Sequence, residues 1–166
     1  EGNATVNVIL DHNTTAGVAY NSTGSNSEMK EVKIKLEEDT STWKNTARLI
    51  TANEIAKITG NTDWDASKTG QDWFCLDTNQ SDTTSYCMKA QGTIKYDWLF
   101  DYTYECTSYG CSISDSSNYG YWTSIPYKDN STHAWRVSRN GSLGSYIVTD
   151  TNYGVRPVIT ISKSNI

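Results

Sequence analysis

Hydrophobic and polar positions alternate near the start of the chain and through its last third, which predicts β-strands in both places. Residues 5–10 alternate as a short strand, and a turn-forming run then leads to residues 18–20, so we expect a hairpin or strand pair at the start. Further strands are expected at 119–127, 133–139, 143–149 and 155–162. Asn140-Gly141 stands between two of them and is a strong local signal for a hairpin.

The strand over residues 133–139 has two different faces. Trp135 and Val137 share one face, whereas Arg136 and Ser138 take the other, as in a half-buried antiparallel strand. Pro157 has no backbone N–H to donate, so we expect it at an edge, at a bulge or at the start of the last strand.

A first helix is predicted after the polar stretch 21–26. Ser27 is the expected N-cap, and the helix is expected to end near Asp39. Its apolar side carries Met29, Val32 and Leu36, at the spacing of one helical face.

A second helix has clearer boundaries. Thr51 and Glu54 form the capping-box pattern, and Gly60 stands where a C-terminal cap belongs. Ile55 and Ile58 are expected to form the apolar stripe between these caps.

Residues 61–94 are polar and irregular, and they predict a long loop. Three aromatic residues are expected to anchor that loop to the body: Trp64, Trp73 and Phe74. Residues 95–102 predict a single helical turn that carries Trp98 and Leu99. The whole pattern predicts one α+β domain over residues 1–166, with two short helices in the N-terminal half, an antiparallel sheet with a C-terminal hairpin, and long irregular loops.

Charge and composition narrow the class of protein. The 166 residues carry 14 Lys and Arg against 19 Asp and Glu, a net charge of −5, and this disfavours a nucleic-acid partner. Six Trp and eleven Tyr supply enough apolar surface for a core, which disfavours disorder. No run approaches the roughly 20 apolar residues of a membrane span, so we expect no direct membrane insertion by this segment. Residues 1–3 do not resemble a signal peptide, and we expect a part excised from a longer exported protein.

Four cysteines, with 19 Ser, 22 Thr and 14 Asn, indicate an oxidising, extracellular location. Local loop closure favours disulfides between Cys75 and Cys87 and between Cys106 and Cys111. A zinc site is the alternative, although only the second pair approaches the spacing of a zinc knuckle.

Catalysis is not expected. His12 and His133 are the only histidines, and neither lies near a recognisable nucleophile motif. We therefore predict no catalytic residue, no resident metal and no cofactor. Calcium is the alternative at Asn61, Asp63 and Asp65, whose oxygens alternate as at the start of a calcium loop, although Ala66 replaces the glycine expected at the sixth position.

Several stretches resemble uncharacterised, pilin-associated surface-protein domains of gut bacteria. The resemblance rests on residues 11–15, 47–56, 98–102, 119–124 and 154–158 and spans most of the chain. In that group, similar regions often follow a pilin-like helix or another export signal. The resemblance therefore implies a bacterial cell-surface location.

The closing pattern also resembles the C-type lectin-like fold, in the branch of the formylglycine-generating enzyme. It consists of strands bearing Trp122, Trp135 and Arg136, a hairpin, and the run 154–156. The residues Ile125-Pro126-Tyr127 lack the calcium ligands of sugar-binding members, and the reactive cysteines of the enzyme have no counterpart here. The resemblance thus implies the scaffold but neither activity.

Some members of this fold bind partners through Tyr-, Ser- and Asn-rich late loops, and residues 107–153 share that composition. We therefore predict an adhesin-like domain that binds a host or bacterial surface protein or glycan, and name four ligand-binding residues: Tyr119, Tyr127, Arg139 and Tyr146. Structural support is assigned to Trp122, Trp135, Arg136 and Arg156. The alternative is a self-assembling, pilin-like subunit of a surface filament or layer.

Overall fold

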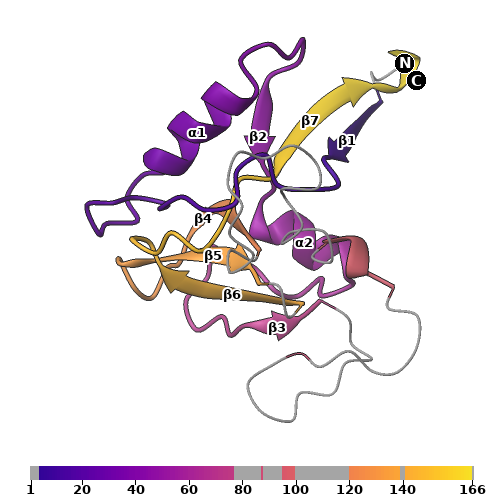
Figure 1. Cartoon of the computed structure of the whole chain (residues 1–166). Helices are drawn as coiled ribbons and strands as arrows, with labels where there is room; N and C mark the ends of the chain where they lie inside the picture. The colour runs from indigo at the N-terminus through magenta and orange to yellow at the C-terminus, as the bar shows by residue number, and fades with distance from the viewer. Residues whose placement is uncertain (1–3, 77–86, 88–94, 100–119, 139–140, 166) are drawn as a thin grey trace.

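Two antiparallel sheets and two helices make up the computed structural model, which describes residues 4–76, 87, 95–99, 120–138 and 141–165 (Figure 1). This arrangement confirms the predicted α+β class. Tyr119, Arg139, Asn140, Cys106 and Cys111 lie outside the described residues. Within the described part, no helix is long and apolar enough to cross a membrane.

The first sheet joins the two ends of the chain. Its strand order is β1 (Thr5–Ile9), β7 (Pro157–Ser162) and β2 (Ala47–Leu49). Thr5 pairs with Ser162, so both ends of the chain lie side by side (Figure 1). Pro157 is the first residue of β7, which is one of its expected positions, but β7 is the central strand of this sheet rather than an edge.

The hairpin expected near the start is wrong, because β1 pairs with the last strand. Residues 14–18 run along residues 153–155 instead of folding back on β1. The Thr14 N–H donates to the Val155 carbonyl at 2.8 Å, and the Val18 N–H donates to the Tyr153 carbonyl at 2.9 Å. The polar run after β1 therefore crosses between sheets, and turn-forming residue types alone do not show this.

The second sheet is built mainly from the last third of the chain. Its order is β3 (Phe74–Cys75), β6 (Ser142–Ile147), β5 (His133–Val137) and β4 (Tyr121–Pro126). The expected hairpin joins β5 to β6, where the Gly141 N–H donates to the Ser138 carbonyl and Gly141 has φ 79°. The positive φ explains why a glycine occupies this turn.

The two faces of β5 contribute to different parts of the core. Trp135 and Val137 share one face and belong to one core cluster with Leu143. Ala134, on the other face, is fully buried in a second cluster with Trp122. The expected half-buried strand is therefore covered on both faces at this point, while Arg136 stays partly accessible.

The first helix, α1 (Glu31–Asp39), ends where it was predicted but begins four residues after the predicted cap. Lys30 is the N-cap and makes no side-chain capping bond. Ser27 does not cap the helix, because its backbone N–H and hydroxyl contact the Ser25 hydroxyl in the preceding turn. Val32 and Leu36 are buried as expected.

The second helix, α2 (Ala52–Ile58), has the predicted capping box between Thr51 and Glu54. Gly60 follows with φ 84°, as its position after the helix predicts. The apolar stripe differs from the prediction, because Ile58 is 39% exposed and the buried face consists of Ala52, Ile55 and Ala56. The helical turn predicted within 95–102 is η1 (Asp97–Leu99), and a further turn, η4 (Lys163–Asn165), follows β7.

Gly120 lies where the second sheet meets the segment that leads into the first. Its φ is 89°, and a Cβ atom here would lie 2.0 Å from the Val137 carbonyl oxygen. Its own carbonyl accepts a bond from the Gly154 N–H, and the Gly154 carbonyl accepts one from the Trp122 N–H. This double contact joins the start of β4 to the segment that leads into β7.

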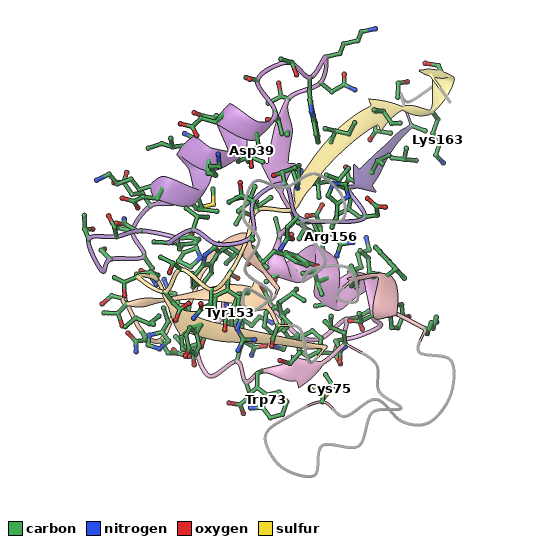
Figure 2. The ribbon with its side chains drawn as sticks, in the orientation of Figure 1. Asp39, Trp73, Cys75, Tyr153, Arg156 and Lys163 are labelled. Atoms are coloured by element: carbon green, nitrogen blue, oxygen red, sulfur yellow. A yellow bond between two sulfur atoms is a disulfide. The ribbon has the colours of Figure 1, made fainter. Side chains whose placement is uncertain are left out.

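Arg156, at the end of that segment, is 1% exposed. Its guanidinium donates to the carbonyls of Leu10, Leu99 and Trp98, each at 2.7 Å, and lies 5.2 Å from the centre of the Tyr121 ring. The arginine thereby ties η1 and the end of β1 to the junction of the sheets. Figure 2 shows it at the centre of the molecule.

Arg156→Met should strongly destabilise the fold. The substitution removes three charge-assisted hydrogen bonds and leaves buried carbonyls without these donors, so we expect the free energy of unfolding to fall by about 4 kcal/mol. Urea unfolding at neutral pH measures this loss. Arg48→Met is the matched control, because Arg48 is partly exposed and its loss should amount to about 1 kcal/mol. Equal losses in the two variants would contradict the role given to Arg156.

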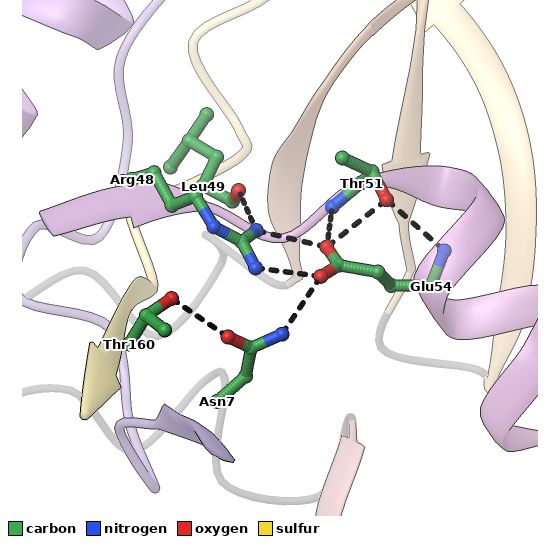
Figure 3. A network of polar contacts seen from close by, with 6 residues as sticks. All are labelled: Asn7, Arg48, Leu49, Thr51, Glu54 and Thr160. Atoms are coloured by element: carbon green, nitrogen blue, oxygen red, sulfur yellow. Dashed lines mark hydrogen bonds and ion pairs between the residues drawn. The ribbon is translucent and has the colours of Figure 1, made fainter. Parts of the chain in front are cut away.

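A polar network around Glu54 connects α2 to the first sheet (Figure 3). The carboxylate accepts two bonds from Arg48 on β2, at 2.6 and 2.8 Å, and one from Asn7 on β1 at 3.1 Å. Thr160 on β7 in turn donates to Asn7 at 2.7 Å. Partial burial raises the pKa of Glu54, but the hydrogen bonds from Arg48 and Thr51 outweigh burial and hold the pKa below its ordinary value.

The lowered pKa of Glu54 predicts an acid-sensitive contribution to stability. A carboxyl group with a depressed folded-state pKa stabilises the protein above its unfolded-state value of 4.5, and this contribution is lost as the pH falls through the folded-state pKa. Glu54→Gln should therefore lower the free energy of unfolding by about 1 kcal/mol at pH 7 and by less at pH 3. Urea titrations at both pH values test this.

The control for Glu54 is Glu37→Gln on the exposed side of α1. Glu37 contacts only Lys33, at 3.9 Å, so its replacement should leave the unfolding free energy nearly unchanged at both pH values. If the difference in unfolding free energy between the wild type and Glu54→Gln is the same at both pH values, the lowered pKa assigned to Glu54 is contradicted.

Candidate functional site

A cavity of about 470 Å³ lies beside the second sheet. β3 pairs with β6 only at Phe74–Leu143 and Cys75–Ser142, so the chain leading into β3 separates from β6 beyond this point. The cavity occupies that separation and extends to the end of β4. Its lining residues are Gln71, Asp72, Trp73, Tyr127, Trp135, Arg136, Ser138, Ser142, Gly144, Ser145, Tyr146 and Tyr153.

Residues 71–73 form one wall of the cavity, and the body of the protein holds this segment at several points. The Asp129 carboxylate accepts a bond from the Gly70 N–H at 2.7 Å. The Gln71 side chain accepts a bond from the Asp65 N–H at 3.1 Å, and the Trp64 indole donates to the Asp72 carbonyl at 2.9 Å. The wall is therefore fixed before any ligand arrives, which lowers the entropy that binding has to overcome.

The disulfide favoured by loop closure, Cys75–Cys87, is present and lies just beyond this wall (Figure 2). Cys75 directly follows Phe74 in β3, and the bond spans 12 positions in the sequence. It therefore fixes the end of β3 that is farther from the cavity.

Trp135, on the face of β5 opposite Arg136, also lines the cavity. It is 1% exposed, and its ring meets Tyr127 and Trp64 edge to face, with ring centres 5.0 and 4.7 Å apart. Trp64 in turn meets Phe74 at 5.3 Å. This aromatic row connects Tyr127 to the strand that carries the wall. The indole Nε1 of Trp135 is buried and has no hydrogen-bond partner among the described residues.

A second aromatic row reaches the cavity from the other core cluster. Trp122, fully buried, meets Tyr153 with ring centres 5.0 Å apart, and Tyr153 meets Tyr146 at 5.4 Å. Tyr146 is 40% exposed, so this row runs from the core to the surface. Burial is the main cause that raises the pKa of Tyr153, which keeps its hydroxyl protonated at neutral pH.

Arg136 lies against this second row. The centre of its guanidinium is 5.2 Å from the Tyr153 ring centre and 5.6 Å from that of Tyr146. Nη1 donates a long hydrogen bond, 3.4 Å, to the Ser142 hydroxyl, and Nε is buried without a partner among the residues that the structure describes. Among the described residues, no carboxylate forms an ion pair with it. Arg136 is therefore a cation held by ring contacts rather than by a counter-ion.

Gly144 makes room for this arrangement. It is the cross-strand partner of Arg136, so both residues face the same side of the sheet. A Cβ atom on Gly144 would lie 3.3 Å from the Trp73 Cβ and 3.5 Å from the Arg136 Nη1. Any larger residue here would press on both the wall and the guanidinium.

The carboxylates of Asp72 and Asp129 place negative charge near Tyr127. Burial, followed by the nearby carboxylates of Asp129 and Asp72, raises the pKa of Tyr127 above its ordinary value. The Tyr127 hydroxyl is therefore protonated at neutral pH. The cavity thus combines an acidic side near Tyr127 with a basic side at Arg136.

The structure brings together two of the four predicted ligand-binding residues. Tyr127 and Tyr146 line the same cavity, although they lie on different strand ends, and Tyr119 and Arg139 lie outside the described residues. Among the predicted support residues, Trp122 and Arg156 are buried, and Trp135 is buried and also lines the cavity. Arg136, expected to have the same structural role as Arg156, lines the cavity instead.

Sequence reasoning missed other residues of this site. Trp73 was expected to anchor the long loop to the body, and the structure places it at the cavity (Figure 2), where it is 41% exposed. Its neighbour Phe74 takes the packing position through pairing with Leu143 and contact with Trp64. Gln71 and Asp72 gave no sequence signal, because only the fold brings them opposite β6. For Arg136 the sequence did hold a signal: the residue lies on the strand face opposite the apolar Trp135.

The stretch proposed for calcium borders a different cavity, of about 560 Å³, lined by Asn61, Asp63 and Asp65 among others. One Asp65 oxygen already accepts bonds from the Ser67 N–H, the Ser67 hydroxyl and the Asn53 amide. Among the described residues, no group of three or more His, Cys, Asp or Glu side chains could hold a metal ion.

Residues 22–163 match the family described as a domain of unknown function (DUF6273). The match covers most of the chain, so the protein belongs to this family. Neither the curated proteins nor the solved structures give a significant match.

Replacing both Cys75 and Cys87 by Ser should lower the free energy of unfolding by about 3 kcal/mol, because the crosslink restricts the unfolded chain. A longer closed loop would give a larger loss. Urea unfolding of the oxidised wild type and the double variant measures the loss. The wild type in a reducing agent serves as a second comparison. An unchanged unfolding midpoint would show that this bond does not stabilise β3.

Proposed function

We propose that this protein is a non-catalytic recognition domain that binds a surface protein or glycan of a host or bacterium in the cavity beside β6. The observation that carries the proposal is the meeting of Tyr127 and Tyr146 in one preformed cavity. Both were named as ligand-binding residues from the sequence. Exposed aromatic rings with polar tips are the side chains that binding sites favour, because they offer large contact areas with few rotatable bonds.

The composition of the cavity supports binding rather than catalysis. Among the described lining residues, Asp72 is the one carboxylate, and there is neither histidine nor cysteine. Nucleophilic catalysis by these serines would require a general base, and the described lining offers no histidine for that role. Tyr127, Tyr153 and Arg136 are suited instead to hold a ligand by contact and hydrogen bonding.

The packing of the late elements supports a C-type lectin-like architecture as part of this proposal. Trp122 on β4, Arg136 on β5, the β5–β6 hairpin and the run 154–156 before β7 all meet around the second sheet. The Cys75–Cys87 disulfide supports an extracellular, cell-surface location, since such bonds persist in oxidising compartments.

Aromatic substitutions at the cavity should weaken binding. We expect the wild type to bind a subset of probes on an array of host and bacterial cell-surface glycans and proteins. Tyr127→Ala, Tyr146→Ala and Trp73→Ala should each lower the affinity for those probes by about tenfold or more, because each removes a ring that contacts the ligand. Titration by fluorescence or calorimetry measures the change.

Trp98→Ala is the matched control for these variants. Trp98 is a similarly exposed tryptophan, at 38%, but it borders a different cavity. The control should bind as the wild type does, and thermal unfolding should confirm that all variants fold. Unchanged binding in all three cavity variants would refute the site. Concentration-dependent polymerisation without any ligand binding would instead favour the filament-subunit alternative.

A further inference from the structure

We infer that the cavity recognises an acidic saccharide, with Arg136 as the residue that binds the sugar carboxylate. This inference rests on the proposed function and specifies its ligand. The sequence assigned Arg136 a structural role, and its surroundings in the fold indicate a different one.

The three described arginines show why Arg136 differs. Arg156 donates hydrogen bonds to three backbone carbonyls, each at 2.7 Å, and Arg48 forms a two-point ion pair with Glu54. Among the described residues, Arg136 donates one long hydrogen bond, 3.4 Å, to Ser142, contacts the Tyr153 hydroxyl, and has a buried Nε without a partner. A partly buried guanidinium with unfilled donors destabilises the fold unless another group fills them.

The orientation of Arg136 is already fixed. Tyr146 and Tyr153 hold its guanidinium by ring contacts, and Gly144 lies against it, where a Cβ atom would come within 3.5 Å of Nη1. A guanidinium positioned in this way matches a carboxylate, which accepts two parallel N–H bonds from it. Because no rearrangement of Arg136 is needed, little of the binding free energy is lost to ordering it.

Charge favours a carboxylate over a phosphate ester. Arg136 is the one Arg or Lys among the described residues that line the cavity, whereas Asp72 lines it too and Asp129 lies beside Tyr127. One guanidinium balances a single negative charge, and these two carboxylates oppose a second one. A phosphate ester, with up to two charges, fits this field less well.

The uncharged side chains of the cavity favour a ligand in which the carboxylate is part of a sugar. Trp73 and Tyr146 present exposed rings, and a pyranose has flat C–H faces that pack on such rings. Its hydroxyl groups can bond to the polar side chains of Gln71, Ser145 and Tyr127 around the same space. A volume of about 470 Å³ also suits a small ligand rather than a long segment of folded protein.

The test is a titration of the wild-type domain with matched pairs of sugars. D-Galacturonate and trigalacturonate are compared with D-galactose and its neutral trimer, followed by indole N–H signals in nuclear magnetic resonance spectra. We expect the acidic sugars to bind about tenfold or more tightly than the neutral ones, a difference of about 1.4 kcal/mol or more. D-Galactose 6-sulfate and a short peptide ending in a free carboxylate complete the set of probes.

Arg136→Gln should lower the affinity for uronates by about tenfold or more, whereas the affinity for the neutral sugar, which has no carboxylate, should fall by a smaller factor. Arg136→Lys should recover only part of the affinity, because a lysine keeps the charge but not the two-point geometry. Lys44→Gln is the matched control, since it removes one positive charge from an exposed position away from the cavity. If Arg136→Gln fails to fold, Arg136→Lys and the paired sugars still decide the question.

Three results would overturn the inference while leaving the proposed function standing. The first is equal affinity for uronates and neutral sugars, and the second is tighter binding of the sulfated sugar or the peptide. The third is uronate binding that depends on Trp73 and Tyr146 but not on Arg136. Absence of uronate binding also overturns it, and the array then decides separately whether the domain binds another ligand. Loss of both uronate and array binding would refute the proposed function as well.

Discussion

Burial of the Arg156 guanidinium is the constraint on which the arrangement of the two sheets depends. Its donors need acceptors inside the protein, and three carbonyls from β1's end and from η1 supply them. The same residue directly precedes β7, the strand that pairs with both β1 and β2. One side chain therefore fixes where the first sheet meets the core around Tyr121, since a displaced Arg156 would leave both the charge and the carbonyls unsatisfied.

This junction also positions the candidate site. The double hydrogen bond between Gly120 and the Gly154 segment sets the start of β4, and β4 sets the position of β5 through the pairs Tyr121–Val137 and Trp122–Arg136. Tyr153, one residue before Gly154, lies on Trp122 and carries Arg136 on its other side. The basic side of the cavity is thus placed by the same contacts that join the sheets, and it does not depend on loop packing alone.

Local signals in the sequence predicted the elements that depend on neighbouring residues. The capping box at Thr51, the turn at Gly141 and the alternation around Trp135 are of this kind, and each is present. The pairing of β1 with β7 could not be predicted in this way, because the partner of Thr5 lies at the far end of the chain. The same reason explains the site: Tyr127 and Tyr146 were identified by residue type, but the wall at Trp73 comes from a segment that only the fold brings to β6.

The arginines show how a binding residue can be separated from a structural one. Burial does not separate them, since Arg48 and Arg136 are both partly buried, and residue type does not either. The difference is whether the protein itself satisfies the donors. Arg156 and Arg48 have acceptors within the fold, so their positions are explained by stability. Arg136 has ring contacts that fix it and space that exposes it, but no acceptor of comparable quality. A fold that positions a cation without neutralising it is arranged for an anion that comes from outside.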